Sequence, residues 1–400
     1  MKQAVILADG LGTRLGELTA STPKPLLEVG GRPFLKYSID HLVRHGIQHV
    51  ILVVGTHAHH FRNFKAQINP NHVRLDIVSD VPIGGTGGAL RFASSLLADQ
   101  FLLLNGNSYF DFNLLDLASP SWTDDIVARI ALRRVTDSAR YGSVALEDGR
   151  VTQFGEKSGS GDGLINGGVY WLRKSLLDQD ASGSMSIEND IFPKAAAERR
   201  LGGAVYDGAF IDIGTPEDLQ RAQSLLPQWQ RRPAAFLDRD GIVNHDTGYV
   251  WHPNNYKWLE GSDRAIKRLN DLGYYVFIVT NQAGVARGLY KTEDIERLHA
   301  YINKTLMTQG AHIDAFYYCP HHPDFGDGEY RQNCACRKPN PGMMLQAMNE
   351  WPVDLSRSFM IGDKDTDMQA AEAAGIPTRR LFLSGSIESA MQEVAPTWEQ

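Results

Sequence analysis

The chain has 400 residues, of which 42% are hydrophobic and 22% are charged, and its formal net charge at pH 7 is -7. This composition is ordinary for folded globular domains, and the length predicts two or three of them. The negative charge, without a long basic run, argues against nucleic acid as a partner. The apolar part of the N-terminus is too short for a signal peptide, and no apolar run is long enough to span a bilayer, so we expect a cytoplasmic protein without a membrane partner.

The first half of the chain alternates short β-rich runs with helical patterns. Residues 4–8, 49–54 and 75–78 predict strands, and residues 33–45 and 57–68 predict helices. Such alternation is typical of an α/β fold in which helices cover a parallel sheet.

A segment with two prolines and two arginines, from Pro227 to Pro233, interrupts this pattern before a new β-rich run begins at Ala234. We place a domain boundary there, with one domain at residues 1–228 and the other at residues 233–400. The second half is predicted to repeat the α/β architecture. Its predicted strands include residues 276–280 and 358–361, and its predicted helices are residues 263–272, 292–308 and 367–374.

A glycine-rich turn, Asp9 to Leu15, follows the first predicted strand. Backbone N–H groups in such a turn can cradle phosphate, and Arg14 and Lys24 add positive charge where a pyrophosphate develops. Together with Gly84 to Leu90, these motifs resemble the sugar-1-phosphate nucleotidyltransferases, and the resemblance extends over residues 3–222. It implies a Rossmann-like fold, a nucleoside triphosphate as partner and a catalytic role for Arg14 and Lys24. It also implies substrate contacts from Gly10, Gly12, Thr13 and Gly87.

Later motifs of that family follow in order. The resemblance implies that Lys157 and Asn166 contact the sugar phosphate and the sugar ring, and that Asp212 binds a catalytic Mg²⁺. Two positions depart from the family pattern. Asn107 replaces an aspartate that, together with the residue matching Asp212, binds the Mg²⁺ in the family, and Asp9 replaces a glycine. We expect either reduced transferase activity or a carboxylate at Asp9 that has taken over the missing place beside the metal.

A second motif begins the other half of the chain, where Asp238 and Asp240 follow an apolar run and precede a glycine. On a strand, two acids at this spacing project to the same side and can share a cation or divide nucleophile and acid work. Thr280 and Asn281 end another buried strand and can hydrogen-bond a phosphoryl group. We expect these strand ends to converge on one site.

Two further motifs add charge to that site. Lys338 is a cation that would offset charge on phosphate and nucleophile, and Asp363 follows an apolar strand and suits Mg²⁺. In order, the four motifs match those of haloacid dehalogenase-like phosphatases. The resemblance implies that Asp238 is a nucleophile that forms an aspartyl-phosphate and that Asp240 is the general acid and base. It also implies a Mg²⁺ site formed by Asp238, Asp240 and Asp363.

All three cysteines of the chain, Cys319, Cys334 and Cys336, lie close to His321 in the sequence. Three thiols and an imidazole fit a closed tetrahedral Zn²⁺ site, and four protein ligands leave no open position, so we expect a structural zinc. A zinc ion would fix the conformation of the cysteine loop and so place Arg337 and Lys338 beside the phosphate of the substrate.

The cysteine loop, with residues 244–250 and 280–288, closely resembles the D-glycero-D-manno-heptose-1,7-bisphosphate 7-phosphatases. The resemblance implies substrate contacts from Asn281, Arg287 and Arg337. Removing the 7-phosphate leaves a heptose 1-phosphate, the kind of sugar phosphate that a nucleotidyltransferase accepts, so we expect one chain to perform both steps. The first half resembles the heptose guanylyltransferases, which implies guanylyl transfer. Two alternatives stay open: a histidinol-phosphate phosphatase, or a phosphatase whose N-terminal half is a silent module that binds nucleotide or sugar phosphate.

Overall fold

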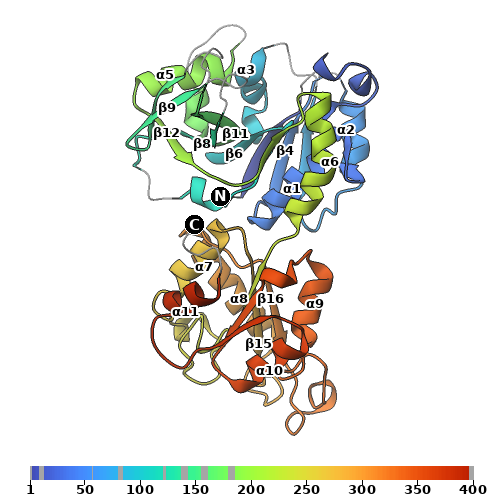
Figure 1. Ribbon diagram of the computed structural model, residues 1–400, viewed down its shortest axis with the longest axis vertical. Helices are drawn as coiled ribbons and strands as arrows, with labels where there is room; N and C mark the ends of the chain where they lie inside the picture. The colour runs from blue at the N-terminus through green and yellow to red at the C-terminus, as the bar shows by residue number, and fades with distance from the viewer. Residues whose placement is uncertain are drawn as a thin grey trace. The chain divides into compact units, whose positions relative to one another are not determined.

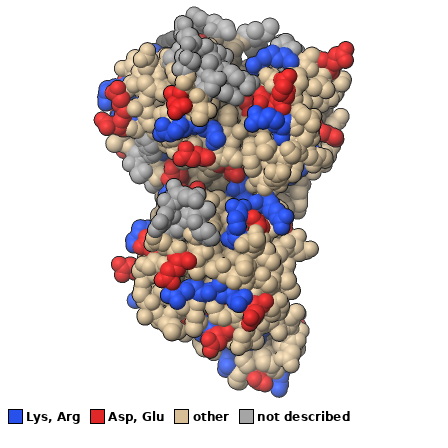
Figure 2. Space-filling view, viewed as in Figure 1, with Lys and Arg blue, Asp and Glu red and all other residues tan. Residues whose placement is uncertain are grey.

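The computed structural model of the chain (Figure 1) describes residues 2–8, 13–55, 57–79, 84–119, 123–136, 143–154, 161–178 and 185–395. The chain divides into two compact units, Met1–Trp229 and Gln230–Gln400. Among the described helices, none combines the length and the apolar character that crossing a membrane requires. On the face seen in Figure 2, basic and acidic side chains lie interspersed among uncharged ones.

The first unit is built on a mixed sheet. Strands β1, β4, β5 and β6 run parallel, which confirms the predicted parallel arrangement for β1, β4 and β5. Strand β11, however, pairs antiparallel with both β6 and β8, so the first unit is not parallel throughout. No helix separates β8 from β11 in the described residues, and parallel pairing needs a crossover that is usually helical. In spatial order the nine described strands of this sheet are β5 (Arg74–Val78), β4 (His49–Val53), β1 (Gln3–Leu7), β6 (Gln100–Asn105), β11 (Gly163–Arg173), β8 (Ala128–Val135), β12 (Leu201–Val205), β10 (Arg150–Phe154) and β9 (Val144–Glu147).

Successive residues of β1 point to opposite faces of this sheet and serve two hydrophobic cores. Val5 packs in one core with residues of α3 and α5, and Ala4 and Ile6 pack in the other with residues of α1, α2 and α4. All three residues are fully buried, as expected for a sheet that helices cover on both faces. The helices of this unit are α1 (Phe34–Arg44), α2 (Ala58–Lys65), α3 (Gly85–Phe92), α4 (Leu114–Leu117), α5 (Phe192–Ala197) and α6 (Pro216–Gln230).

Two small antiparallel ribbons complete the unit. One pairs β2 (Glu28–Val29) with β3 (Arg32–Pro33), and the other pairs β7 (Ser108–Phe110) with β13 (Phe210–Asp212). In the second ribbon Asp212 lies directly opposite Ser108. Residues from two distant parts of the sequence therefore meet just beyond the carboxyl end of β6.

The predicted interruption at Pro227 is not observed, because α6 continues through this proline to Gln230. A proline in a helix donates no hydrogen bond to the preceding turn, and near the helix end this costs a single bond. The ring also packs against Gly30, where an added Cβ would come within 2.5 Å of Pro227 Cγ. The division between the two units falls after Trp229, inside the segment from Pro227 to Pro233.

The second unit has a parallel sheet in the order β16-β15-β14-β17-β18. Successive residues of β14 again serve two cores, since Ala235 and Leu237 pack on one face and Ala234 and Phe236 on the other. The strands are β14 (Ala234–Leu237), β15 (Tyr275–Asn281), β16 (Ala315–Cys319), β17 (Phe359–Gly362) and β18 (Thr378–Leu381), and the helices are α7 (Ser262–Asp271), α8 (Thr292–Met307), α9 (Gly342–Glu350), α10 (Asp365–Ala373) and α11 (Ile387–Val394).

Candidate active sites

Three carboxylates meet at the carboxyl end of the parallel sheet in the second unit. Asp238 follows β14, Asp363 follows β17 and Asp367 lies in the first turn of α10, and one oxygen of each lies within 4.8 Å of the others. Neighbouring parallel strands end at the same edge of a sheet, which explains the meeting. Oδ1 of Asp363 is buried and has no hydrogen-bond partner among the described residues. An acceptor left open beside two further carboxylates fits a hard cation such as Mg²⁺.

Sequence reasoning missed Asp367. The signal was present, because an acid four residues after Asp363 stands in the first turn of a predicted helix. Acids at that position usually satisfy backbone N–H groups, and Oδ2 of Asp367 indeed accepts the N–H of Lys364 at 3.0 Å. Its Oδ1 lies 2.6 Å from Lys338 Nζ, and the carboxylate is a member of the three-carboxylate group, so the capping position alone did not reveal its place in the site.

Lys338 joins two of these carboxylates. Its Nζ lies 2.9 Å from Oδ1 of Asp238 and 2.6 Å from Oδ1 of Asp367, and Lys338 and Asp238 are only 4% and 5% exposed. Burial raises the pKa of Asp238 to about 7, against the opposing charge of Lys338. Burial alone would lower the pKa of Lys338, but the charges of Asp238 and Asp367 outweigh it and raise that pKa. The lysine therefore stays charged beside a carboxylate that is hard to ionise without it.

The carboxylate of Asp240 is not a member of this group and is held by hydrogen bonds from three neighbours. Its Oδ1 accepts from Asn244 Nδ2 at 2.9 Å, and its Oδ2 accepts from Gln282 Nε2 at 3.0 Å. Arg239, which is 0% exposed, donates from Nη2 to Asp240 Oδ2 at 2.9 Å and to the Val250 carbonyl at 2.6 Å. The carboxylate therefore has a fixed orientation, whereas its predicted role as a metal ligand stays a prediction that this geometry does not favour.

Replacing Arg239 by methionine is expected to lower the free energy of unfolding by about 3 kcal/mol, because the change leaves a mostly buried carboxylate without its counter-charge. Urea denaturation of the parent and the variant measures this difference. Arg264→Met is the matched control, since Arg264 pairs with Glu388 at the surface and its loss should cost less than about 1 kcal/mol. Equal losses from the two substitutions would contradict the assignment of Arg239 as an obligatory partner of Asp240.

A cavity of about 220 Å³ opens over these groups, and Asp238, Asp240, Thr280, Asn281 and Lys338 line it. Thr280 Oγ1 accepts a hydrogen bond from Gln282, and the Asn281 side chain exchanges two hydrogen bonds with the backbone of Lys338, at 3.0 and 3.1 Å. Asn281 thus holds the lysine segment in place as well as facing the cavity.

The two arginines predicted to contact substrate do not line this cavity. The Arg287 guanidinium carbon lies 3.6 Å from the centroid of the Phe325 ring, and Arg337 Nη1 donates to the His321 carbonyl at 3.2 Å. Arg337 belongs to the segment that carries the cysteines, and Arg287, from the loop after β15, packs on Phe325 of that segment. Their contact with substrate stays a prediction.

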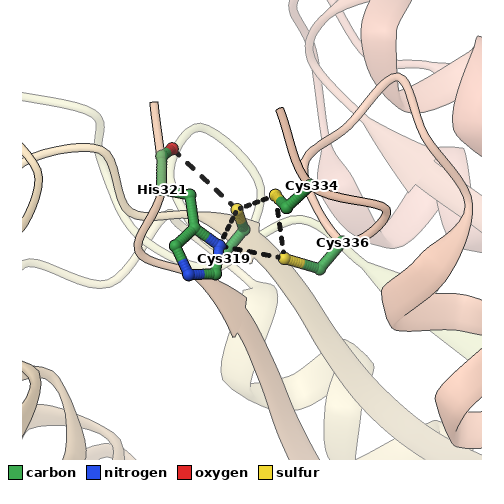
Figure 3. Close-up of side chains that lie close together, drawn as sticks. All are labelled: Cys319, His321, Cys334 and Cys336. Carbon is green, nitrogen blue, oxygen red and sulfur yellow. Dashed lines mark hydrogen bonds between the residues drawn. The ribbon is translucent and has the colours of Figure 1, made fainter. Parts of the chain in front are cut away.

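Figure 3 shows the cluster of Cys319, His321, Cys334 and Cys336, whose ligand atoms all lie within 4.8 Å of one another. The sulfur atom of Cys334 lies 3.4 Å from that of Cys319 and 3.1 Å from that of Cys336, and His321 Nδ1 lies 3.4 Å from the Cys336 sulfur. Tetrahedral Zn²⁺ with thiolate ligands has ligand-to-ligand edges of roughly 3.8 Å, so a small expansion accommodates the ion. The hydrogen bond between Cys319 and Cys336 lowers the pKa of the Cys336 thiol to about 5 and, with burial, raises the pKa of the Cys319 thiol, so Cys336 is the thiolate of this pair before zinc binds.

Protein purified without chelators is expected to contain about one zinc ion per chain, and Cys334→Ser should lose it. Because a structural metal stabilises the folded loop, the variant should also unfold at a lower temperature than the parent. Atomic emission measures the zinc, and calorimetry measures the melting temperature. A zinc-free parent with the same melting temperature as Cys334→Ser would contradict the assignment.

The first unit has its own polar cavity, of about 260 Å³, which Arg14, Asn166 and Asp212 line with other residues. A Cβ added at Gly214 would lie 2.6 Å from Asp212 Oδ1, 3.3 Å from Arg14 Nη2 and 3.6 Å from Lys24 Nζ. The absence of a side chain at Gly214 therefore lets three charged groups approach one another. Burial raises the pKa of Asp212 and lowers that of Lys24, while their mutual attraction across 3.9 Å opposes both shifts.

Asn107 lies beside this charged group. Its Nδ2 donates to Asp212 Oδ2 at 2.7 Å, so the amide takes up one of the oxygens that a metal would use. An asparagine adds no negative charge to the site. The pair of Asn107 and Asp212 therefore fits Mg²⁺ less well than two carboxylates would.

The other predicted contacts of the first unit have mixed outcomes. Asn166 lines the cavity and donates from Nδ2 to the Tyr170 hydroxyl at 2.9 Å. The N–H of Gly87 donates to the Met185 carbonyl at 2.8 Å, and a Cβ there would lie 3.0 Å from Ile191, so this glycine is a close-packing position whose N–H is already used. Five predictions lie outside the described side chains: Asp9, Gly10, Gly12, Thr13 and Lys157.

Comparisons with known proteins separate the two halves of the chain. The family model described as nucleotidyl transferase matches residues 3–228, and the one described as HAD-hydrolase-like matches residues 335–398. A D-glycero-beta-D-manno-heptose-1,7-bisphosphate 7-phosphatase of Rhodopseudomonas palustris is 52% identical over 147 residues, which cover 37% of this chain and 82% of that protein. The enzyme of the same name from Yersinia pestis is 44% identical over 169 residues, which cover 42% of this chain and 90% of that protein.

The chain belongs to the nucleotidyl transferase family in its first half and to the family of these phosphatases in its second. Among solved structures, HddC from Yersinia pseudotuberculosis matches with a TM-score of 0.51 and 33% identity, over 56% of this chain and 98% of that one. The same protein complexed with GMP-PN matches with a TM-score of 0.50 and 32% identity, over the same shares of both chains. The nucleotidyl transferase half thus has a relative whose nucleotide-bound structure is known.

Proposed function

We propose that the second half of the chain removes the 7-phosphate from D-glycero-D-manno-heptose 1,7-bisphosphate, and that the first half transfers a nucleotidyl group to the resulting heptose 1-phosphate. The observation that carries the proposal is the group of Asp238, Lys338, Asp363 and Asp367 at the end of a parallel sheet, in which all but Asp363 are buried. The heptose substrate rests on the phosphatase relatives, which are named for it.

Asp238 is the nucleophile in this proposal. Its carboxylate attacks the phosphorus of the 7-phosphate, the bond from phosphorus to the sugar oxygen breaks, and Asp240 gives that oxygen a proton. Water then attacks the phosphorus of the aspartyl-phosphate and gives a proton to Asp240, the bond from phosphorus to the Asp238 oxygen breaks, and inorganic phosphate leaves with the Asp238 carboxylate restored. Lys338 holds Asp238 in position at 2.9 Å and offsets the charge of the transferring group, to which Thr280 offers its hydroxyl.

Asp238, Asp363 and Asp367 would hold Mg²⁺ in this site. The ion would supply positive charge to the phosphoryl oxygens and keep Asp238 ionised, in spite of the burial that raises its pKa. Asp240 lies outside the three-carboxylate group and lines the cavity, where it can exchange a proton with the leaving group and with water.

In the first half, an oxygen of the heptose 1-phosphate attacks the α-phosphorus of a nucleoside triphosphate, and pyrophosphate leaves. Arg14 and Lys24, gathered around Gly214, offset the negative charge that develops. GTP is the proposed nucleotide, supported by the HddC structure complexed with GMP-PN.

The test incubates the purified chain with each anomer of heptose 1,7-bisphosphate, Mg²⁺ and each of the four nucleoside triphosphates, and follows the products by mass spectrometry. We expect phosphate release followed by one GDP-heptose. Histidinol phosphate is the control substrate for the phosphatase, and faster phosphate release from it would replace the heptose proposal. Phosphate release with none of the four nucleotides consumed would leave the N-terminal half as a binding module.

A further inference from the structure

Ser108 begins β7 and lies directly opposite Asp212 of β13 in the antiparallel ribbon. Side chains of directly opposite residues project from the same face of a ribbon. Ser108 and Asp212 both line the 260 Å³ cavity of the first unit. The serine hydroxyl therefore lies next to the group of charges that is proposed to act on phosphate.

The Ser108 hydroxyl has no hydrogen-bond partner among the described residues, although the residue is only 7% exposed. A buried hydroxyl without a partner destabilises the folded state, because it loses its hydrogen bonds to water and gains none in return. Three other polar side chains of the same cavity differ: Asn166 bonds Tyr170, Glu188 bonds Thr86, and Thr215 bonds Asp218. A hydroxyl kept at such a cost is best explained by a partner that arrives with the substrate.

The space beside this hydroxyl is kept open by a glycine. A Cβ at Gly168, whose φ is +73°, would lie 2.7 Å from Ser108 Oγ and 3.1 Å from Asn105 Nδ2. The Gly168 N–H donates to Asn166 Oδ1 at 2.9 Å, which fixes the turn. Any side chain at this position would cover the hydroxyl and strain the backbone. Glycine at 168 thus preserves access to Ser108.

Three uncharged polar side chains of the cavity lie around one glycine. Arg14 and Asp212 lie close to Gly214, whereas Asn105, Ser108 and Asn166 lie around Gly168 and carry no charge. Cationic side chains suit a phosphate, and neutral amides and hydroxyls suit the hydroxyl groups of a sugar.

We propose that Ser108 is a sugar-binding residue of the nucleotidyl transferase site, and that its hydroxyl exchanges a hydrogen bond with a ring hydroxyl of the sugar 1-phosphate. The assignment rests on the proposed function, because it takes the substrate of that site to be a sugar 1-phosphate. It adds a contact that the charged group around Gly214 does not supply.

The test measures binding of D-glycero-D-manno-heptose 1-phosphate to the full chain by titration calorimetry, with the parent, Ser108→Ala and Ser108→Cys. Each variant should bind the sugar phosphate roughly three- to tenfold more weakly, as the loss of one neutral hydrogen bond predicts. Binding of GTP and of inorganic phosphate should stay within twofold of the parent. The melting temperature of unliganded Ser108→Ala should equal or exceed that of the parent, because the change removes a buried hydroxyl without a partner.

Ser262→Ala is the matched control. Ser262 is fully buried in the second unit, but its hydroxyl bonds the carbonyl oxygens of Val243 and Leu259, both at 2.8 Å. This variant should melt below the parent and bind the sugar phosphate as the parent does. The two serines should thus differ in the sign of the thermal shift and in the effect on binding.

Three outcomes would overturn the assignment, and they are distinguishable. If the parent binds heptose 1-phosphate and both Ser108 variants bind it equally well, Ser108 makes no contact with the sugar. If binding of inorganic phosphate weakens by the same factor as binding of the sugar phosphate, the hydroxyl contacts the phosphate instead. If the parent binds no sugar 1-phosphate of either anomer, the proposed function of the first half fails and the assignment fails with it.

Discussion

Asp238→Asn is expected to reduce phosphate release from heptose 1,7-bisphosphate by roughly four orders of magnitude or more, because an amide cannot act as the nucleophile. The fold should survive, since an amide of the same shape fills the same space and still accepts a hydrogen bond from Lys338. Phosphate release by the parent and the variant, measured with Mg²⁺ in excess, tests this expectation. Circular dichroism of both proteins tests the fold.

Asp271→Asn is the matched control for this change. Asp271 ends α7 in the same unit and pairs with Lys267 at 2.8 Å on the exposed side of the helix, so the same chemical change should leave phosphate release unaltered. Acid quenching of the parent during turnover should also trap one phosphoryl group on the chain, and Asp238→Asn should trap none. Phosphate release by Asp238→Asn at close to the parent rate would end the aspartyl-phosphate proposal.

The same strand ends explain why this site was predictable from the sequence. Asp238, Thr280 and Asp363 each follow an apolar run that forms a parallel strand, and parallel strands bring their carboxyl ends to one edge. Proximity along that edge follows from strand order, so motifs far apart in the sequence could be placed in one site. The cysteine cluster was predictable for a simpler reason, because all three thiols and the histidine lie within 18 residues of one another.

The features that sequence reasoning missed depend on contacts rather than on strand ends. Asp367 reaches the site from a helix, and its capping of Lys364 looks the same in the sequence whether or not it also faces Asp238. Arg239 lies between two acids at the end of a strand, where the sequence pattern does not tell whether a polar side chain is buried or exposed. Only the fold shows that it is fully buried against Asp240. The antiparallel pairing of β11 likewise follows from the path of the chain, which local periodicity does not record.

Asp212→Asn is expected to reduce nucleotide-dependent pyrophosphate release by about a thousandfold, because it removes a negative charge that faces Lys24 and Arg14 and would bind Mg²⁺. Pyrophosphate release in the presence of GTP, heptose 1-phosphate and Mg²⁺ measures the effect. Phosphate release by the second half should not change in this variant, which provides an internal control on folding and concentration. A variant as active as the parent would exclude Asp212 from the reaction.

The variant Asn107→Asp restores the aspartate that the nucleotidyltransferase pattern has at this position. It tests whether asparagine has reduced the transferase activity of the first half. Asn107 now donates to Asp212 at 2.7 Å, so an aspartate would replace this hydrogen bond with the repulsion of two carboxylates and should lower the melting temperature of the metal-free protein. With Mg²⁺ bound between the two oxygen ligands, the repulsion is offset, and we expect pyrophosphate release about tenfold faster than in the parent, at a lower Mg²⁺ requirement. If the parent already releases pyrophosphate rapidly and Asn107→Asp releases it more slowly, the site functions better with asparagine at this position. The interpretation of reduced transferase activity is then wrong.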